Sequence, residues 1–489
     1  MRLGESTLSQ LPDYIRRPTY NRKKVEASIV HLGLGAFHRA HQALMTEAVL
    51  NSGDLAWGIV GAGMQSSGMR DALAPQDGLY AVAEVGADSE KISVVGAIVD
   101  LLGGADEAEK IRLLAKMSDI STRIVSITVT EKGYYLDLAT GKLLVQSEAI
   151  EADLANPDVP RTILGLIVRA LAKRKEAGIP PFTVLSCDNL PNNGKLARVA
   201  VLAFAREVDS GLAEWIEKNV CFPCTMVDRI TPATTDADRA HINKRLGLED
   251  AWPVMTEQFV QWVIEDQFSM GRPDWTIGGA VFSDEIERWE SMKLRCLNGA
   301  HSTLAYLGQL TGCETVADAM QSPLITTLLD VLWLENREVL QAPKGVNPAD
   351  YVEQLKLRFR NPSLKHRTAQ IASDGSQKLP QRLLAPLRER IAKGIASPAI
   401  ATAIAAWMHF VVKTAHTSGA SLSDPMAAEI LEQAGKSTQA AEIVDGLLGL
   451  QKIFGQDLAT NEAFRAELLG KFVELAKNPG VATAAQIVI

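Results

Sequence analysis

The sequence predicts an α/β domain with a largely parallel sheet, followed by a mainly α-helical domain. Short apolar runs rich in β-branched residues alternate with helical patterns through the first half of the 489-residue chain, as in consecutive βαβ units. After about Glu285, Ala- and Leu-rich helical periodicity replaces the strand signals. Since one core of ordinary size does not serve a chain of this length, we expect two domains, residues 1–285 and 286–489.

Each element has its own signal. Five apolar runs are expected as buried strands: Ala27–Gly33, Trp57–Gly63, Lys91–Ile98, Arg123–Thr130 and Phe182–Asn189. Helical patterns at 105–117 and 161–178 lie between some of these runs, which favours parallel strands joined by crossover helices. In the second half, amphipathic or apolar helical patterns are expected at 325–340, 398–415 and 440–454.

The composition excludes several classes of protein. A formal net charge of −8 argues against a basic surface that holds nucleic acid or an anionic membrane. The N-terminus has no continuous apolar core of the kind a signal peptide needs, and the run Ala399–Val412 fits a buried helix better than a membrane span. Five cysteines fit a reducing compartment. We therefore expect a soluble, cytoplasmic protein with no nucleic-acid or membrane partner.

A glycine-rich turn follows the first predicted strand and opens a helix. In "HLGLGAFHRAHQAL", Gly33 and Gly35 allow a tight turn and a close approach of backbone N–H groups to a pyrophosphate. His38 stands where the third glycine of a dinucleotide-binding turn is usual. The pattern predicts a Rossmann-type, dinucleotide-binding domain, with the cofactor held along Gly33, Gly35, Ala36, Phe37, His38 and Arg39.

The sequence leaves the choice between NAD and NADP open. The acidic residue that usually follows the second strand and binds the adenosine ribose is missing. Gln65, Ser66 and Ser67 stand in its place, with Arg70 slightly beyond. Small polar residues near an Arg can tolerate a 2′-phosphate, but Arg70 can equally lie on the solvated face of the next helix.

A predicted helix in the second half carries three polar residues among apolar ones. In "SMKLRCLNGAHSTLAYLG", Lys293, Asn298 and His301 project at about 0°, 140° and 80° if each residue turns an α-helix by about 100°. A single lysine on a helix usually reaches solvent, but a lysine, an amide and an imidazole on one arc suggest a site. No cluster of Cys, His and carboxylate residues has metal-ligand spacing, so we expect no metal.

Several ordered motifs together name a family. The chain resembles the polyol-specific long-chain dehydrogenases, also called the mannitol dehydrogenase family, through the motifs "HLGLGAFHRAHQAL", "TVTEKGYY", "SCDNLPNNG", "MVDRITP", "QWVIEDQF", "GRPDW" and "MKLRCLNGAHSTLAYLG". The resemblance extends from about Ile29 to about Phe454. It implies an NAD(P)-dependent oxidoreductase that interconverts a secondary alcohol and a ketone without a metal, and a monomer or weak oligomer.

The resemblance also implies roles for individual residues. Lys293 would be the general acid/base, with a pKa lowered by burial beside the nicotinamide. Asn189 and Asn298 would hydrogen-bond the reacting oxygen, and His301 would orient the substrate. Two further matches are left open: Glu131 would connect the lysine to solvent or pair with Lys132 or Arg229, and Asp228 would contact substrate or cap a turn.

The segment "NPSLKHRTAQIASDGSQKLPQRLL" points to the substrate. It is similar to the hexuronate reductase branch of the family, and its cations Arg367, Lys378 and Arg382 suit the carboxylate of a sugar acid. We therefore expect D-mannonate and D-fructuronate as substrates. At position 260, however, the chain has Val, as in the polyol branch. D-mannitol and D-fructose, or a related polyol, therefore stay as alternative substrates. A non-enzymatic nucleotide-binding sensor is the third reading.

Overall fold

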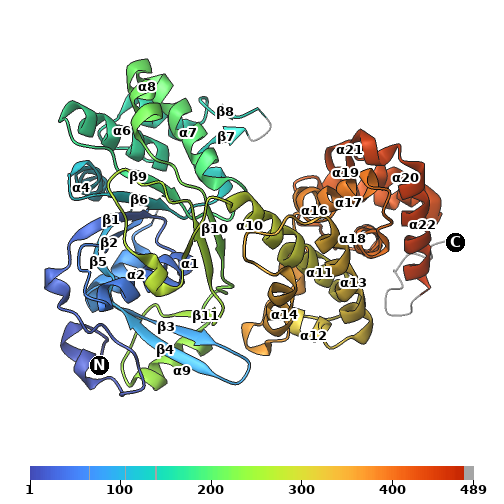
Figure 1. Cartoon of the computed structure of the whole chain (residues 1–489), viewed down its shortest axis with the longest axis horizontal. Coiled ribbons are helices and arrows are strands. Elements are labelled where there is room, and N and C mark those ends of the chain that lie inside the picture. The colour runs from blue at the N-terminus through green and yellow to red at the C-terminus, as the bar shows by residue number, and fades with distance from the viewer. Residues whose placement is uncertain (65, 105, 138–139, 478–489) are drawn as a thin grey trace. The chain divides into compact units, whose positions relative to one another are not determined.

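The computed structural model describes residues 1–477 except 65, 105 and 138–139. By their internal contacts these residues form two units, Met1–Glu287 and a second that begins at Arg288 (Figure 1).

Five parallel strands form the main sheet of the first unit. Their bounds are β1 (Ala27–Leu32), β2 (Gly58–Gly63), β5 (Ile98–Gly103), β6 (Ile124–Ile127) and β9 (Thr183–Ser186). They lie in the order β5-β2-β1-β6-β9, and Val30 of β1 is in register with Val60 of β2 and Val125 of β6. The chain therefore crosses from one half of the sheet to the other between β5 and β6, and the strand order reverses where β1 lies beside β6, as in a Rossmann-type fold.

Both faces of this sheet are buried. Val30 and Leu32 pack on one side with apolar residues of the helices α4 (Glu107–Ser118), α6 (Ile163–Glu176) and α7 (Asn193–Val208). Ile29 packs on the other side with residues of α2 (Gln42–Asn51) and with Trp262 and Trp275. Burial on both faces explains why these strands appear in the sequence as continuous apolar runs. The predicted fold class is confirmed for both halves of the chain.

One predicted strand is wrong in its bounds. The run Lys91–Ile98 is divided at Gly96 and Ala97 into β4 (Glu90–Val95) and the start of β5. β4 pairs antiparallel with β3 (Tyr80–Val85), outside the main sheet. β3 was not expected, because its Ala-rich sequence "YAVAEV" gives a weak strand signal.

Three smaller sheets complete the first unit. They have the strand orders β11-β3-β4, β10-β12-β13 and β7-β8. The additional strands are β7 (Leu136–Asp137), β8 (Lys142–Leu143), β10 (Thr225–Asp228), β11 (Val254–Glu257), β12 (Gln261–Ile264) and β13 (Val281–Phe282). Its α-helices are α1 (Ala36–Ala40), α2 (Gln42–Asn51), α3 (Gly68–Leu73), α4 (Glu107–Ser118), α5 (Glu148–Ala155), α6 (Ile163–Glu176), α7 (Asn193–Val208), α8 (Ser210–Asn219) and α9 (Asp236–Leu246).

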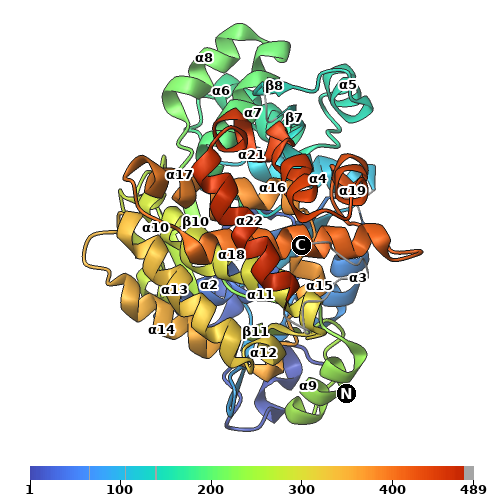
Figure 2. The same cartoon turned by 90° about the vertical axis from the view of Figure 1, so that its right-hand side faces the viewer.

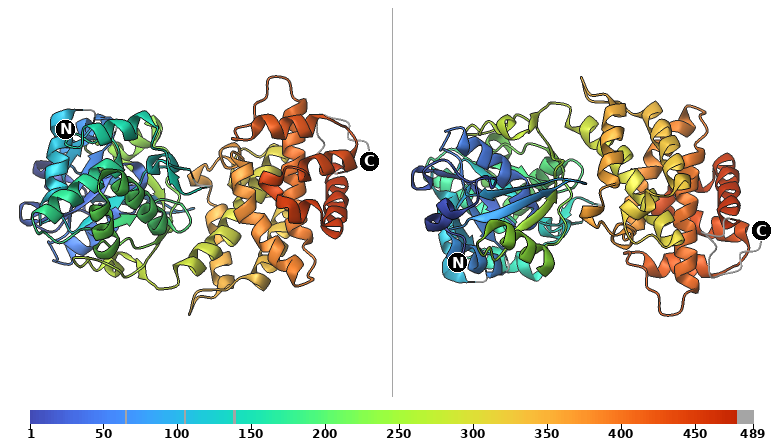
Figure 3. Two further views of the ribbon diagram at one scale, coloured as in Figure 1. Left: turned by 90° about the horizontal axis from the view of Figure 1, so that it is seen from above. Right: turned by 90° about the horizontal axis from the view of Figure 1, so that it is seen from below.

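The second unit, in the part that the structure describes, consists of helices and contains no strand (Figure 3). The first helix is α10 (Ile286–Met292), continued by a π-helical segment, Lys293–Asn298, and by α11 (Gly299–Thr311). The others are α12 (Val316–Ala319), α13 (Pro323–Val339), α14 (Pro348–Phe359), α15 (Thr368–Ile371), α16 (Gly375–Leu379), α17 (Ala385–Ala392), α18 (Pro398–His416), α19 (Ala427–Gly435), α20 (Ala440–Leu448), α21 (Gln451–Ala459) and α22 (Glu462–Ala476).

α18 is the central helix of the second unit. It packs against α11, α13, α19 and α22, and Figure 2 shows α22 running across it. Among the described helices it alone is long and apolar enough to cross a membrane, but 67% of that apolar window is buried inside the protein. This burial agrees with the prediction of a core helix at Ala399–Val412.

Candidate active site

The first glycine of the turn after β1 has a backbone conformation that other residues rarely adopt. Gly33 has φ 103°, and a Cβ atom there would lie 2.0 Å from the carbonyl oxygen of Thr128. Gly35, the residue before α1, has φ −104°, and a Cβ atom there would meet only Gly33 O, at 3.8 Å. Gly33 is thus required by the fold. The space beside Gly35 is open, as a turn that a pyrophosphate approaches requires.

His38 explains why the third glycine can be missing. Its buried ring lies flat on that of His31 in β1, with the centroids 3.4 Å apart. His31 in turn contacts Ser126 Oγ and Thr128 Oγ1, each at 2.8 Å. Burial lowers the pKa of His31 to about 3 and that of His38 well below its usual value. Two neutral imidazoles therefore fill the space between β1 and α1.

The side chains of the remaining turn residues lie in different surroundings. Phe37 is half-buried and stacks on His41, with ring centroids 4.7 Å apart. His41 also separates α1 from α2, so the single helix expected here is broken. The buried guanidinium of Arg39 donates to the carbonyl of Trp252 and lies over the ring of Tyr80. These contacts give Arg39 a structural role and disfavour the predicted cofactor contact by its side chain.

The region after β2 contains a network of charges. Ser67 Oγ donates to Asp71 Oδ2 at 2.6 Å. Arg70 forms ion pairs with Asp71 and with Glu109 and donates to the carbonyl of Gly103. Arg70 is therefore already neutralised by two carboxylates. Gln65 lies outside the described residues.

The ends of β6 and β9 bring two predicted site residues into neighbouring segments. Asn189 follows β9 and is exposed, and Glu131 begins the 3-10 turn Glu131–Tyr134 after β6 and is also exposed. Asp188 joins the two segments: its carboxylate accepts hydrogen bonds from Val129 N at 2.7 Å and from Tyr134 Oη at 2.6 Å. The candidate residues thus lie at the carboxyl edge of the sheet, where α/β proteins bind ligands.

Asp228 is the last residue of β10, and Arg229 follows it. Asp228 is buried and stands opposite Gln261 in the ladder between β10 and β12. Arg229 forms an ion pair with Glu84 and donates to the carbonyls of Ala40 and Glu257. The proposed pairing of Arg229 with Glu131 is therefore wrong, because Glu84 holds that guanidinium.

The helix with Lys293, Asn298 and His301 departs from the predicted geometry. Lys293–Asn298 is a π-helix in which Gly299 N donates to Leu294 O, five residues back. A π-helix has more residues per turn than an α-helix, so Lys293 and Asn298 lie on one face, closer together than the separation of about 140° in an α-helix. His301 follows three residues later on the same side. All three are buried, with 7–8% of their surface exposed.

His301 lies among cations and rings. Its ring centroid is 4.7 Å from that of Phe359 and 5.0 Å from that of His366. Burial lowers its pKa well below the usual value, and the nearby charges of Arg382, Arg358 and Lys293 act in the same direction. The Nε2 atom of His301 and the Oδ1 atom of Asn298 have no hydrogen-bond partner in the described part of the chain. Both are buried polar atoms whose hydrogen-bonding capacity is unused by the described residues.

Of the three predicted carboxylate-binding cations, the structure brings Arg382 to this helix. It lies on a second π-helical segment, Pro380–Leu384, which packs closely on the first because Gly299 has no side chain. Arg382 Nη1 donates to Ser302 Oγ at 3.1 Å. In the residues that the structure describes, its other two nitrogens donate no hydrogen bond and no carboxylate pairs with it. Burial lowers its pKa to about 10, so it stays charged at neutral pH.

The other two cations are placed differently. Lys378 Nζ donates to the carbonyls of Ile371 and Ser373, at 3.2 and 2.7 Å, and to Ser373 Oγ. These three bonds use the three donors of the ammonium group and disfavour substrate binding by Lys378. Arg367 is exposed before α15, and within the described residues its side chain has no hydrogen bond or ion pair.

Sequence reasoning missed three residues of these clusters: Asp188, Arg358 and His366. Asp188 and His366 stand beside predicted residues, but the sequence does not reveal that their side chains point into the protein. Arg358 has 7% of its surface exposed and occurs in "LKLRFR", which looks like a solvated helix face. The burial of Arg358 becomes evident only in the folded structure, where α14 packs against the rest of the second unit.

Comparisons with known proteins agree with this architecture. Residues 27–277 match the model of the mannitol dehydrogenase Rossmann domain, and residues 285–476 match that of the mannitol dehydrogenase C-terminal domain. The chain belongs to the mannitol dehydrogenase family. It is an oxidoreductase, as are the relatives described next.

Three relatives illustrate the range of the family. D-mannonate oxidoreductase from Escherichia coli K12 is 44% identical over 96% of this chain and 97% of that protein. The ternary complex of Pseudomonas fluorescens mannitol 2-dehydrogenase with NAD and D-mannitol is 38% identical, with a TM-score of 0.84 and 98% of each chain covered. Substrate-free D-sorbitol dehydrogenase is 33% identical, with a TM-score of 0.90 and 100% of each chain covered.

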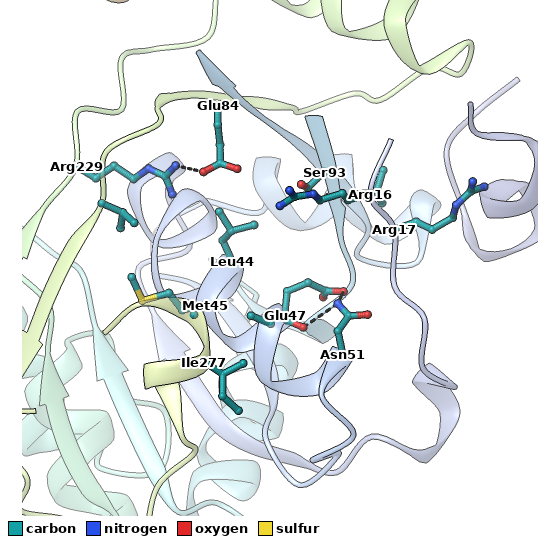
Figure 4. A pocket seen from close by; sticks show the side chains of 14 residues that line it. Arg16, Arg17, Leu44, Met45, Glu47, Asn51, Glu84, Ser93, Arg229 and Ile277 are labelled. Carbon is teal, nitrogen blue, oxygen red and sulfur yellow. Dashed lines mark hydrogen bonds and ion pairs between the residues drawn. The ribbon is translucent and has the colours of Figure 1, made fainter. Parts of the chain in front are cut away.

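Figure 4 shows a separate cavity of the first unit, of about 300 Å³. It lies beside α2 and the β3–β4 hairpin, and the labelled side chains of Arg229 and Glu84 are joined across one end of it. None of the predicted cofactor residues lines it. In the described part of the chain, no group of three or more His, Cys, Asp or Glu residues is placed to hold a metal ion.

Proposed function

We propose that this oxidoreductase interconverts D-mannonate and D-fructuronate with NAD as the cofactor. The observation that carries the choice of substrate is Arg382, a partly buried guanidinium with no carboxylate partner among the described residues. Burying a charge without a counter-charge is costly, and a bound sugar acid would supply that counter-charge. Arg can hold a carboxylate through two parallel hydrogen bonds. The 44% identity to a D-mannonate oxidoreductase supports the same choice.

The turn after β1 suits a dinucleotide. Gly33, Gly35, Ala36, Phe37 and His38 would hold the pyrophosphate through their backbone. The open space beside Gly35 fits this role. When bound, NAD supplies the acceptor for the hydride that leaves the alcohol carbon. The pairing of Arg70 with Asp71 and Glu109 favours NAD over NADP, because a 2′-phosphate near these two carboxylates would be repelled.

Lys293 would be the general acid/base. In oxidation its neutral amine takes the hydroxyl proton of the substrate as hydride leaves the same carbon. In reduction its ammonium returns a proton to the carbonyl oxygen. Lys293 is buried, and a general base must be able to release its own proton near the working pH. Asn298 would hydrogen-bond the reacting oxygen from the same helix face, and His301 would orient a neighbouring hydroxyl.

Asn189, Asp228 and Glu131 keep their predicted roles as part of this proposal. Asn189 would add a second amide at the reacting oxygen, Asp228 would contact a substrate hydroxyl, and Glu131 would exchange protons with solvent. The exposure of Glu131 and Asn189 suits groups that meet a ligand or water.

D-mannitol and D-fructose are the second candidate pair. The observation that favours them is the 38% identity to a mannitol 2-dehydrogenase over 98% of the chain. Val260, which resembles the polyol branch, packs against the apolar cluster of the first unit. A neutral polyol would leave Arg382 without a counter-charge, so we place this pair second.

The test is the initial rate of NADH and NADPH oxidation by the purified protein, with D-fructuronate and D-fructose in parallel. We expect a high rate with NADH and D-fructuronate. A high rate with D-fructose alone would move the protein to the polyol branch. If NADH binds but no sugar acid or polyol is turned over, the protein would be a nucleotide-binding sensor.

A further inference from the structure

We propose that Asp188 is a positioning residue that holds the turn with Glu131 and the strand end with Asn189 in one fixed arrangement. The inference rests on the proposed function, because it assumes that Asn189 and Glu131 serve the reaction. Asp188 itself does not need to touch substrate. It would act through its two neighbours.

The hydrogen bonds of Asp188 join three segments. Oδ1 accepts from Val129 N, two residues before Glu131. Oδ2 accepts from Tyr134 Oη at the other end of the same turn. The main-chain carbonyl of Asp188 accepts from Asn193 Nδ2 at 2.9 Å, at the start of α7. The carboxylate thus fixes both ends of the turn after β6 to the residue next to Asn189.

The surroundings of Asp188 are buried and contain few charges. Only 7% of Asp188 is exposed, and Tyr134 is fully buried. In the described residues no lysine, arginine or histidine pairs with Asp188. The titratable groups that face it are Tyr134 from the turn and Cys187 from its own segment. Burial therefore raises the pKa of Asp188 to about 7.

Ser186 allows this arrangement to persist in both protonation states. Ser186 Oγ lies 2.7 Å from Tyr134 Oη, and either oxygen can be the donor. With Asp188 ionised, Tyr134 donates to the carboxylate. With Asp188 protonated on Oδ2, the carboxyl can donate to Tyr134, which then donates to Ser186. Oδ1 accepts from Val129 N in both states.

This reversal gives a matched pair of variants. In Asp188→Asn, the amide oxygen can accept from Val129 and the amide nitrogen can donate to Tyr134, so the variant imitates the protonated form. Asp188→Ala removes both bonds. We expect Asp188→Ala to lower kcat about 10- to 100-fold, since a misplaced catalytic group costs this much, with NADH affinity unchanged. Asp188→Asn should keep most of the activity.

The experiment measures kcat and KM from pH 5.5 to 8.5, and hydrogen exchange of the peptide 128–136, for the wild type and both variants. Because the arrangement persists in both protonation states, the pH profiles of the wild type and Asp188→Asn should have the same shape, and Asp188→Ala should exchange Val129 N–H faster. Wild-type kcat with an unchanged pH profile in Asp188→Ala would overturn the proposal.

Two further outcomes are separable. If the wild type turns over no substrate, the proposed function fails, but exchange still tests the fixed arrangement: unchanged protection in Asp188→Ala would overturn it. If Asp188→Ala does not fold, Tyr134→Phe replaces it. Loss of the Tyr134 donor should lower kcat and speed hydrogen exchange of the peptide 128–136, and wild-type kcat and exchange in Tyr134→Phe would contradict the inference.

Discussion

Arg382 Nη1 donates a hydrogen bond to Ser302 Oγ at 3.1 Å, and this contact links the π-helical segment Pro380–Leu384 to α11 in the second unit. Ser302 is fully buried on the turn that follows Asn298. The guanidinium is therefore fixed in position beside the helix of Lys293, while two of its nitrogens remain available to a ligand. A fixed, charged donor suits a substrate group of constant charge and planar shape, such as a carboxylate.

Replacing Arg382 with Ala should lower kcat/KM for D-fructuronate about 10- to 100-fold more than for D-fructose. A hydrogen bond to a charged group contributes about 1.5–3 kcal/mol. D-fructuronate would lose this contribution in the variant, whereas D-fructose has no carboxylate and would not. The measurement is kcat/KM for both substrates. Arg367→Ala is the matched control, because that side chain is exposed, and it should change the ratio little. Equal losses on both substrates in Arg382→Ala would remove this residue from carboxylate recognition.

Replacing Lys293 with Ala should lower turnover about 10²- to 10⁴-fold, the usual contribution of a general acid/base, while NADH affinity stays close to that of the wild type. Steady-state rates and a fluorescence titration with NADH separate the two effects. Lys195→Ala is the control, because this exposed lysine pairs with Glu287 at the surface. Turnover at the wild-type level without Lys293 would disprove the mechanism.

Much of this site could be predicted from the sequence, but the shape of its helix could not. Residue types and spacing were enough to single out Lys293, Asn298 and His301. The α-helical period, however, separates Lys293 from Asn298 by about 140°. The π segment reduces this separation, and it packs against Pro380–Leu384, about 85 residues further along the chain. No local signal in "KLRCLN" encodes that contact.

The same distinction applies to charged residues. Judged from the sequence alone, four cations are equally good candidates for binding an anion: Arg367, Lys378, Arg382 and Arg39. The structure separates them by the acceptors they find: two backbone carbonyls for Lys378, the carbonyl of Trp252 for Arg39, and a serine hydroxyl for Arg382. Which acceptor a long side chain reaches depends on distant segments, so spacing alone does not predict it.

Replacing Gly35 with Ala should weaken NADH binding without lowering thermal stability. A Cβ atom at Gly35 meets no protein atom closer than 3.8 Å, so any effect must come from the ligand side. Gly33→Ala should instead destabilise the protein, because its Cβ atom would clash with Thr128 O and its positive φ is unfavourable for alanine. Thermal melts and NADH titrations on both variants test this. Wild-type NADH affinity in Gly35→Ala would show that the turn does not approach the cofactor at that residue.

Replacing His38 with Phe should make the protein less sensitive to acid. Burial holds the pKa of His38 well below 6.5, so as the pH falls below about 6.5 the unfolded chain binds a proton that the folded chain refuses, and stability is lost. For one such histidine the loss between pH 7 and pH 5 is about 2 kcal/mol. Phe preserves a flat ring for stacking on His31 and cannot titrate.

The measurement is the free energy of unfolding by denaturant at pH 7 and pH 5 for the wild type and His38→Phe. The other buried titratable groups are common to both proteins, so their contributions cancel in the difference. We expect the wild type to lose about 2 kcal/mol more than the variant over this interval. An equal loss in both would mean that His38 accepts a proton in the folded state, and the neutral stack on His31 could not then explain the absence of the third glycine.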